Sequence, residues 1–113
     1  MSKKVLLDTD TILYAISHNL SLSPKGYAIS IITEIELHSS LRFQEMIPFF
    51  KVYKINKLIR KKSKELKRSY GLSFYESVIC ATAMIHKNML LTGNRHLSQI
   101  SNLNSFLIHR SER

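Results

Sequence analysis

The segment Val5-Leu6-Leu7-Asp8 is a short apolar run that ends at an acidic residue. Such a run, bounded by polar residues, predicts a short buried strand, and Thr11–Ser17 is predicted to form a short helix after it. An acidic residue at this junction is informative, because the chain has 8 Asp and Glu residues against 17 Lys and Arg residues. Asp8 is therefore the first candidate for a functional residue.

Two further acidic residues lie at similar junctions. Glu36 follows a predicted strand, Tyr27–Ser30, and lies inside a predicted helix, Ile32–Leu41. Glu76 begins a helix-like stretch predicted to extend to about Asn88. If the fold brings these residues together with Asp8, they would form an oxygen-ligand metal site in a basic protein.

The rest of the chain alternates between predicted strands and helices. The predicted strands are Phe50–Ile55, Met89–Thr92 and Ser105–Ile108. A helix is predicted at Lys57–Tyr70, where Gly71 ends it, and a weak helix or turn is predicted at Arg95–Ile100. A turn is predicted at Ser21–Gly26, and Phe43–Phe49 is ambiguous, with a short helix ended by Pro48 as one reading.

This alternation predicts an α/β fold in which helices flank a parallel central sheet of four to five strands. In such sheets, ligands bind beyond the carboxyl ends of the strands. Asp8, Ser30 and the segment Thr92-Gly93-Asn94 all fall at that edge. The first turns of the helices that contain Glu36 and Glu76 can point side chains toward it.

Length and composition narrow the class of protein. A chain of 113 residues that is 44% hydrophobic is expected to form a single globular domain over residues 1–113. Cys80 is the only cysteine, which excludes an intrachain disulfide, and nothing indicates secretion. Val5–Leu7 is too short for a signal peptide or a membrane span, so a cytoplasmic location without membrane contact is expected.

The positive charge is concentrated in one segment. Residues 51–70 contain nine Lys and Arg residues and one acid, Glu65, which gives +8 of the chain's net charge of +9. This clustering predicts a polyanionic partner, because phosphate contacts dominate the affinity of proteins for nucleic acids. The alternative is a solvated helix face that only keeps the protein soluble. An anionic membrane is a poorer match, since the segment has no broad face of large apolar residues.

Clustered carboxylates in a basic protein indicate metal-dependent phosphodiester hydrolysis. Mg²⁺ and Mn²⁺ prefer carboxylate and carbonyl oxygens, and such an ion can activate water and offset the charge of the transition state. Without a metal, the carboxylates would repel one another, so a purely structural cluster would be costly.

Each carboxylate also has a structural interpretation. Asp8 could be the N-cap of the following helix, Glu36 could complete a capping box with Thr33, and Glu76 fits a capping box with Ser73. Asp10 could contact the metal-binding residues without binding the ion itself, or could serve only as a helix cap.

Other residue types add one candidate and exclude several classes of site. Asn94 could be a neutral ligand or bind phosphate, or could be an ordinary turn residue. The five histidines form no zinc-hydrolase motif, and no Gly-rich phosphate loop is present. Cys80 lies among apolar residues and is expected in the core.

Four segments, in order, resemble the PIN-domain family, of the VapC-like type found as toxins in bacterial toxin–antitoxin pairs. The first segment contains Asp8, and Ser30-Ile-Ile-Thr33-Glu-Ile-Glu36-Leu37 resembles the family's S-x-x-T-x-x-E-L motif. The segment from Tyr70 to Ala83, with Glu76, is similar to one that usually ends in D-A-x-I-A-A-T-A. The segment Leu90-Leu-Thr92-Gly-Asn94-Arg-His96-Leu97 resembles the T-x-N-x-x-F stretch.

The chain departs from this family pattern at four places. Glu76 stands where the family has Asp, His96 where another Asp is frequent, and Leu97 where Phe is usual. The segment between Leu37 and Phe50 is short for the family.

The resemblance implies a Mg²⁺- or Mn²⁺-dependent endoribonuclease. Asp8, Glu36 and Glu76 would bind the metal and orient water, Asn94 would assist, and the basic segment would guide RNA. The resemblance further implies a homodimer and an antitoxin protein that blocks the acidic groove.

Two alternatives remain open. The departures at Glu76 and His96 favour a degenerate PIN domain that acts as a non-catalytic RNA-binding or regulatory module. The same metal chemistry would also cut DNA, since discrimination between the polymers rests on contacts to the 2′-hydroxyl.

Overall fold

The computed structural model, which describes residues 4–22 and 25–108, contains a sheet of five parallel strands. The strands are β1 (Val5–Leu7), β2 (Tyr27–Ser30), β3 (Lys51–Tyr53), β4 (Met89–Thr92) and β5 (Ser105–Leu107). Their order across the sheet is β3-β2-β1-β4-β5, and every neighbouring pair is parallel. The predicted parallel α/β sheet of four to five strands is confirmed, with β1 at its centre.

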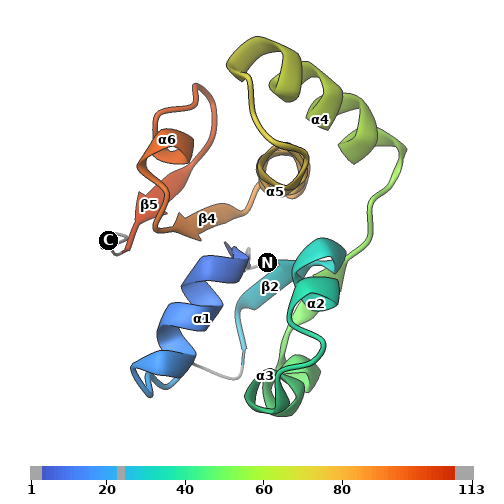
Figure 1. The fold of residues 1–113 in the computed structure, drawn as a ribbon. Coiled ribbons are helices and arrows are strands. Elements are labelled where there is room, and N and C mark those ends of the chain that lie inside the picture. Colours follow the sequence, from blue (N-terminus) through green and yellow to red (C-terminus); the bar gives the residue numbers. More distant parts are fainter. Residues whose placement is uncertain (1–3, 23–24, 109–113) are drawn as a thin grey trace.

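Helices cover both faces of this sheet (Figure 1). The helices α1 (Thr9–Ser17) and α3 (Leu41–Met46) lie on one side, and α4 (Lys57–Tyr70), α5 (Phe74–His86) and α6 (Arg95–Ser98) lie on the other. The short α2 (Ile31–Glu36) follows β2 directly, and a 3₁₀ turn (Ile47–Phe49) follows α3. No helix within the described ranges is long and apolar enough to cross a bilayer.

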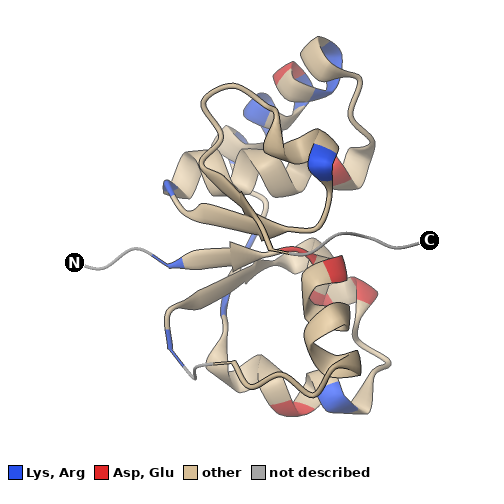
Figure 2. Cartoon of the chain, turned by 90° about the vertical axis from the view of Figure 1, so that its left-hand side faces the viewer, with Lys and Arg blue, Asp and Glu red and all other residues tan. Residues whose placement is uncertain are grey.

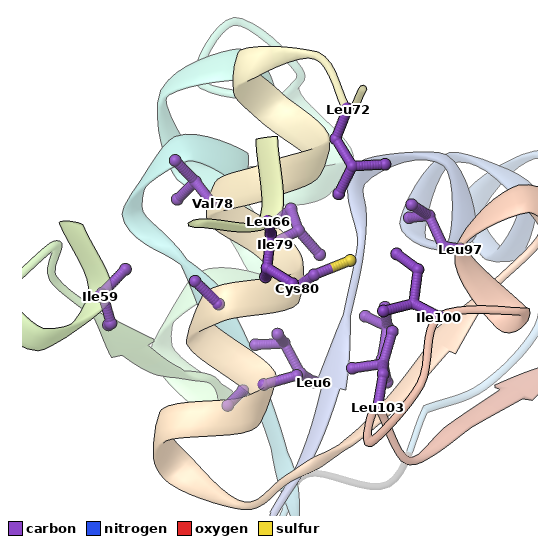
Figure 3. Packing of buried hydrophobic residues seen from close by; sticks show 14 residues of the cluster. Leu6, Ile59, Leu66, Leu72, Val78, Ile79, Cys80, Leu97, Ile100 and Leu103 are labelled. Atoms are coloured by element: carbon purple, nitrogen blue, oxygen red, sulfur yellow. The ribbon is translucent and has the colours of Figure 1, made fainter. Parts of the chain in front are cut away.

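The strands place alternate residues on the two faces, as the period of two requires. Leu6 of β1 and Leu90 of β4 belong to the larger core cluster, which includes residues of α4, α5 and α6 (Figure 3). Their neighbour Leu7 belongs to the second cluster, with Ile12 of α1 and Phe43 of α3, and Leu91 packs against this cluster. Both faces of β1 are therefore buried, which holds the end of this strand at a fixed position.

The prediction of one continuous helix from Ile32 to Leu41 is wrong. The structure has two helices here, because α2 ends at Glu36 and α3 begins after Ser40. The Ser40 hydroxyl accepts a hydrogen bond from the Phe43 backbone N–H at 3.2 Å and so caps the new helix. The change of direction places Phe43 in the core, where it is fully buried.

Other boundaries differ by small amounts. Helix α1 begins at Thr9 instead of Thr11, α6 ends at Ser98, and β3 and β5 are shorter than predicted. The helix within Phe43–Phe49 extends from Leu41 to Met46, and Pro48 lies in the 3₁₀ turn that follows. The predicted turn Ser21–Gly26 lies partly outside the described residues.

The junction between α4 and α5 agrees with its prediction. Gly71 ends α4 in the left-handed conformation, with φ of +66°, and its N–H donates to the carbonyl of Lys67 at 2.9 Å. Ser73 and Glu76 then form the expected capping box at the start of α5. The junction sets where α5, and with it Glu76, lies on the sheet.

Gly71→Ala is expected to lower the free energy of unfolding by about 1 kcal/mol, because a Cβ disfavours the left-handed backbone conformation. The added Cβ would meet no heavy atom within 4 Å, so the cost is conformational and not steric. Gly71→Asn is the matched control and should cost less, since Asn tolerates this conformation. Urea unfolding measures both variants, and an equal loss for both would contradict a conformational origin.

Candidate functional site

The four residues predicted to form the site all lie at the carboxyl edge of the sheet. Asp8 follows β1, Glu36 is the last residue of α2, Glu76 is in the first turn of α5, and Asn94 lies two residues beyond β4. In Figure 2, acidic residues of α1, α2 and α5 gather on the side where the strands end. Because the strands are parallel, segments distant in the sequence meet at this edge.

Asp8 is the buried residue of the site, with a relative exposure of 4%. One carboxylate oxygen, Oδ1, accepts a hydrogen bond from the Thr11 backbone N–H at 2.9 Å, so Asp8 is indeed the N-cap of α1. The other oxygen, Oδ2, accepts from the Thr92 hydroxyl at 2.6 Å. The cap thus uses one oxygen, and the second connects Asp8 to the end of β4.

A chain of hydrogen bonds extends from Asp8 to Glu76. The Thr92 hydroxyl that donates to Asp8 also accepts from the Asn94 backbone N–H at 3.0 Å. The Asn94 side-chain amide then donates to Glu76 Oε2 at 3.1 Å. The remaining oxygen of Glu76, Oε1, accepts from the Ser73 N–H at 3.0 Å. Glu76 therefore takes part in the capping box and in the network at the same time.

Glu36 is connected to the same region through Thr9. The Thr9 hydroxyl donates to Glu36 Oε1 at 2.5 Å and accepts from the Tyr75 hydroxyl at 2.8 Å. Tyr75 in turn accepts from the Thr9 backbone N–H at 2.7 Å. Thr9 directly follows Asp8, so one peptide unit joins this second branch to the first.

The proposed capping box between Thr33 and Glu36 is wrong. Ser30 is the N-cap of α2, and its hydroxyl accepts from the Ile32 N–H at 3.1 Å. Thr33 lies inside the helix, fully buried, with its hydroxyl 3.2 Å from that of Thr9. Glu36 is consequently not a cap, and its carboxylate is held by Thr9 across the sheet edge.

The three carboxylates are joined through Thr and Asn side chains and do not converge on one point. Within residues 4–22 and 25–108, no group of three or more His, Cys, Asp or Glu side chains is arranged to hold a metal ion. The oxygen donors at this edge, from carboxylates, Thr hydroxyls and the Asn94 amide, are of the type that a hard cation binds. In this structure the three carboxylates are not arranged around a common point where an ion could bind.

Two other residues that the sequence indicated lie beside the network. Asp10 is exposed in the first turn of α1, and together with Gly93, Asn94 and Arg95 it lines a hollow next to the site. His96 is exposed on α6, and its backbone N–H donates to Asn94 Oδ1 at 2.9 Å. Asn94 is therefore the N-cap of α6 as well as a partner of Glu76.

Burial controls the titration of this region. It raises the pKa of Asp8, and the hydrogen bonds from Thr92 and Thr11 oppose this increase. Burial, followed by the charge of Asp8, also raises the pKa of Tyr75, which stays a neutral hydrogen-bonding group. Burial raises the pKa of Cys80 to about 12, which agrees with a core residue and not a nucleophile.

Thr9, Thr92 and Tyr75 were not predicted from the sequence as members of the site. Thr92 donates a hydrogen bond to Asp8, Thr9 donates one to Glu36, and Tyr75 donates one to Thr9. Thr92 had a recognisable signal, because a hydroxyl residue at the end of a buried strand lies beside the residue that ends the neighbouring strand. Tyr75 had none, since only the packing of α5 directs its side chain toward Thr9.

Asp8→Asn is expected to raise the melting temperature at pH 7 in the presence of EDTA. An acid whose pKa is raised in the folded state binds a proton more readily there, so folding stability is lost as pH rises through the interval between the unfolded and the folded pKa. The Asn side chain does not titrate, so the variant does not lose this stability as pH rises. Its melting temperature should equal that of the wild type below the unfolded pKa of Asp, about 3.9.

Thermal unfolding from pH 3 to pH 8 measures this difference, with Asp10→Asn as the control that removes an exposed acid from the same helix turn. A lower melting temperature of Asp8→Asn throughout that range would mean that the carboxylate's hydrogen bonds outweigh its desolvation.

Thr92→Val is expected to lower the free energy of unfolding by about 1–3 kcal/mol, because it leaves a buried carboxylate oxygen and the Asn94 N–H without their partner. Thr92→Ser keeps the hydroxyl and should lose less. Urea unfolding at pH 7 compares the two variants, and equal losses would show that the methyl group, not the hydroxyl, is responsible.

No family model and no curated protein matches the sequence. Solved structures do match. A chain of a toxin–antitoxin complex from Klebsiella pneumoniae is 27% identical, with a TM-score of 0.73 over 88% of this chain and 95% of that chain.

Two DNA-bound complexes are also similar. A chain of VapBC from Salmonella typhimurium has a TM-score of 0.77 at 20% identity, over 93% of this chain and 98% of that one. A chain of VapBC2 from Rickettsia felis has a TM-score of 0.72 at 20% identity, over 90% of this chain and 96% of that one. With the order of the strands and the position of the acidic residues, these similarities establish that the chain has the fold of a VapC-like PIN domain.

Proposed function

We propose that the protein is a metal-dependent endoribonuclease and the toxin of a bacterial toxin–antitoxin pair. The observation on which this rests is the buried carboxylate of Asp8 at the carboxyl edge, connected by hydrogen bonds to Glu76 and, through Thr9, to Glu36. Within the described residues, no Lys or Arg forms an ion pair with any of these three acids. A buried charge without a counter-charge is costly, and a cation at this edge would remove that cost.

Asp8, Glu36 and Glu76 are the residues that would hold the ion, and Mg²⁺ or Mn²⁺ suits their oxygen donors. Because their side chains do not converge in this structure, they would have to turn toward one another to bind it. Such an ion would lower the pKa of water and offset the negative charge that develops on a phosphate. The chain's own contribution is to keep these acids in place. Thr92 and Thr11 orient Asp8, Thr9 orients Glu36, and Asn94 orients Glu76 and could also donate to a phosphate oxygen.

The proposed partners are RNA, an antitoxin protein and a second copy of the chain. The antitoxin is supported by the similar chains, which come from toxin–antitoxin complexes. RNA as the substrate and the homodimer follow from the family resemblance.

A second candidate function is a non-catalytic RNA-binding or regulatory module. One observation favours it: both oxygens of Glu76 already accept hydrogen bonds, one in the capping box and one from Asn94. Binding a metal would require Glu76 to share or exchange these partners. A module that does not bind metal would keep them.

RNA cleavage in the presence of Mg²⁺ or Mn²⁺ tests the first candidate. We expect Asp8→Asn and Glu36→Gln each to lower the rate by at least about 100-fold, by analogy with the loss of one group that stabilises a transition state. Glu34→Gln is the matched control, because Glu34 belongs to the same helix and has no hydrogen bond to the Thr9 branch in the described structure. Cleavage that survives both changes would contradict the proposed site.

Thermal unfolding with Mn²⁺ distinguishes the two candidates. A nuclease with this metal site should gain stability from Mn²⁺, and Asp8→Asn should abolish the gain. RNA binding without cleavage and without stabilisation by Mn²⁺ would instead establish the second candidate.

Glu76→Asp restores the residue that is usual in the family and should raise the rate of RNA cleavage if the length of the Glu76 side chain limits activity.

A further inference from the structure

Helix α4 (Lys57–Tyr70) presents a row of basic side chains along one exposed face. Residues three, four and seven positions apart share a face of an α-helix, because the helix repeats every 3.6 residues. The basic residues with this spacing, all of them exposed, form what we call the α4 stripe: Lys57, Arg60, Lys61, Lys64, Lys67 and Arg68.

The orientation of this face is fixed by the packing of the helix. Ile59 is fully buried and Leu66 is 6% exposed, and both belong to the core cluster that includes α5. These two residues are seven positions apart, so they mark the inner face of α4. The α4 stripe lies on the opposite face, and Figure 2 shows Lys and Arg along this outer helix.

The positive charge of the α4 stripe is not neutralised by acidic neighbours. The one acid of the helix, Glu65, pairs with Lys62 at 3.3 Å, and neither residue belongs to the stripe. In the described ranges no ion pair involves a residue of the stripe. A row of like charges repels itself and destabilises the helix slightly, and a polyanion bound along the stripe would offset this repulsion.

The C-terminal end of the stripe lies close in the chain to the carboxyl edge of the sheet. The Lys67 ammonium donates to the Leu72 carbonyl at 3.5 Å, which holds this end against the connection to α5. That connection leads directly to Ser73 and Glu76 of the capping box. From Lys57 to Arg68 the helix rises about 17 Å, at about 1.5 Å per residue, which is long enough to contact several consecutive phosphates.

We propose that the α4 stripe binds the phosphate backbone of a single RNA strand and holds it next to the acidic carboxyl edge. The choice of RNA rests on the proposed function, whereas the requirement for a polyanion rests on the stripe itself. In this proposal the α4 stripe and the acidic carboxyl edge have different roles. The basic helix supplies affinity, and the acidic edge, which alone would repel phosphate, supplies the chemistry.

A binding assay in EDTA tests this proposal without cleavage. The probe is a fluorescein-labelled oligouridylate, and anisotropy gives Kd at several salt concentrations. The stripe variant is Lys61→Gln/Lys64→Gln/Arg68→Gln, since Gln keeps the helix propensity. The matched control is Arg42→Gln/Lys51→Gln/Lys54→Gln, which removes the same number of Lys and Arg charges from exposed positions outside α4.

For the stripe variant we expect Kd to rise about 100-fold at about 0.1 M salt, and the slope of log Kd against log salt to fall by about 2, because each phosphate contact contributes about 0.7. The control should change both quantities much less. Circular dichroism confirms that α4 remains folded in each variant.

Equal effects of the stripe variant and the control would overturn the proposal, because the binding would then follow net charge alone. An equal loss of affinity for labelled polyglutamate would overturn it as well, since the surface would then serve an acidic protein. The outcome for the proposed function is separate. If RNA binding depends on the stripe but no metal-dependent cleavage occurs, the proposed nuclease function is contradicted and RNA binding by the stripe is supported. If cleavage occurs but RNA binding does not depend on the stripe, the nuclease function is supported and RNA binding by the stripe is contradicted.

Discussion

The burial of the Asp8 carboxylate at the end of the central strand is the constraint on which the other features of the site depend. The strand β1 has neighbours on both sides and core clusters on both faces, so the residue after it cannot move to solvent without disturbing the sheet. A carboxylate held there must be satisfied by hydrogen bonds, by protonation or by a cation. Thr11 and Thr92 supply hydrogen bonds to it, one to each oxygen.

This constraint explains why the other polar residues have their positions. Thr92 must end β4 next to Asp8, and Asn94 must follow it to hold Glu76. Thr9 must point across the edge to Glu36, and Tyr75 fixes Thr9 from the side of α5. The positive charge of the chain lies elsewhere, mainly on α4, so the acidic edge keeps its negative character.

Much of this arrangement could be predicted from the sequence, because it depends on local patterns. The apolar run before Asp8, the alternation of strands and helices, the Gly71 stop and the Ser73 capping box all act over a few residues, and the structure agrees with each. The parallel sheet predicted from this alternation also correctly placed Asp8, Glu36, Glu76 and Asn94 at one edge.

The rest depends on packing between distant segments, which a single sequence does not reveal. The break after Glu36 arises because Ser40 caps a second helix and Phe43 enters the core. The branch from Glu36 through Thr9 to Tyr75 joins residues that are 27 and 66 positions apart, so no local motif could indicate it.

The proposed divalent cation would compensate the buried charge of Asp8. The most direct test is to measure the pKa of this carboxylate by its ¹³C chemical shift, with and without Mg²⁺. Without the ion, the pKa should lie above its ordinary value, because burial disfavours the charged form. With Mg²⁺, it should fall well below that value, because the ion favours the carboxylate. The same raised pKa in both conditions would contradict the account.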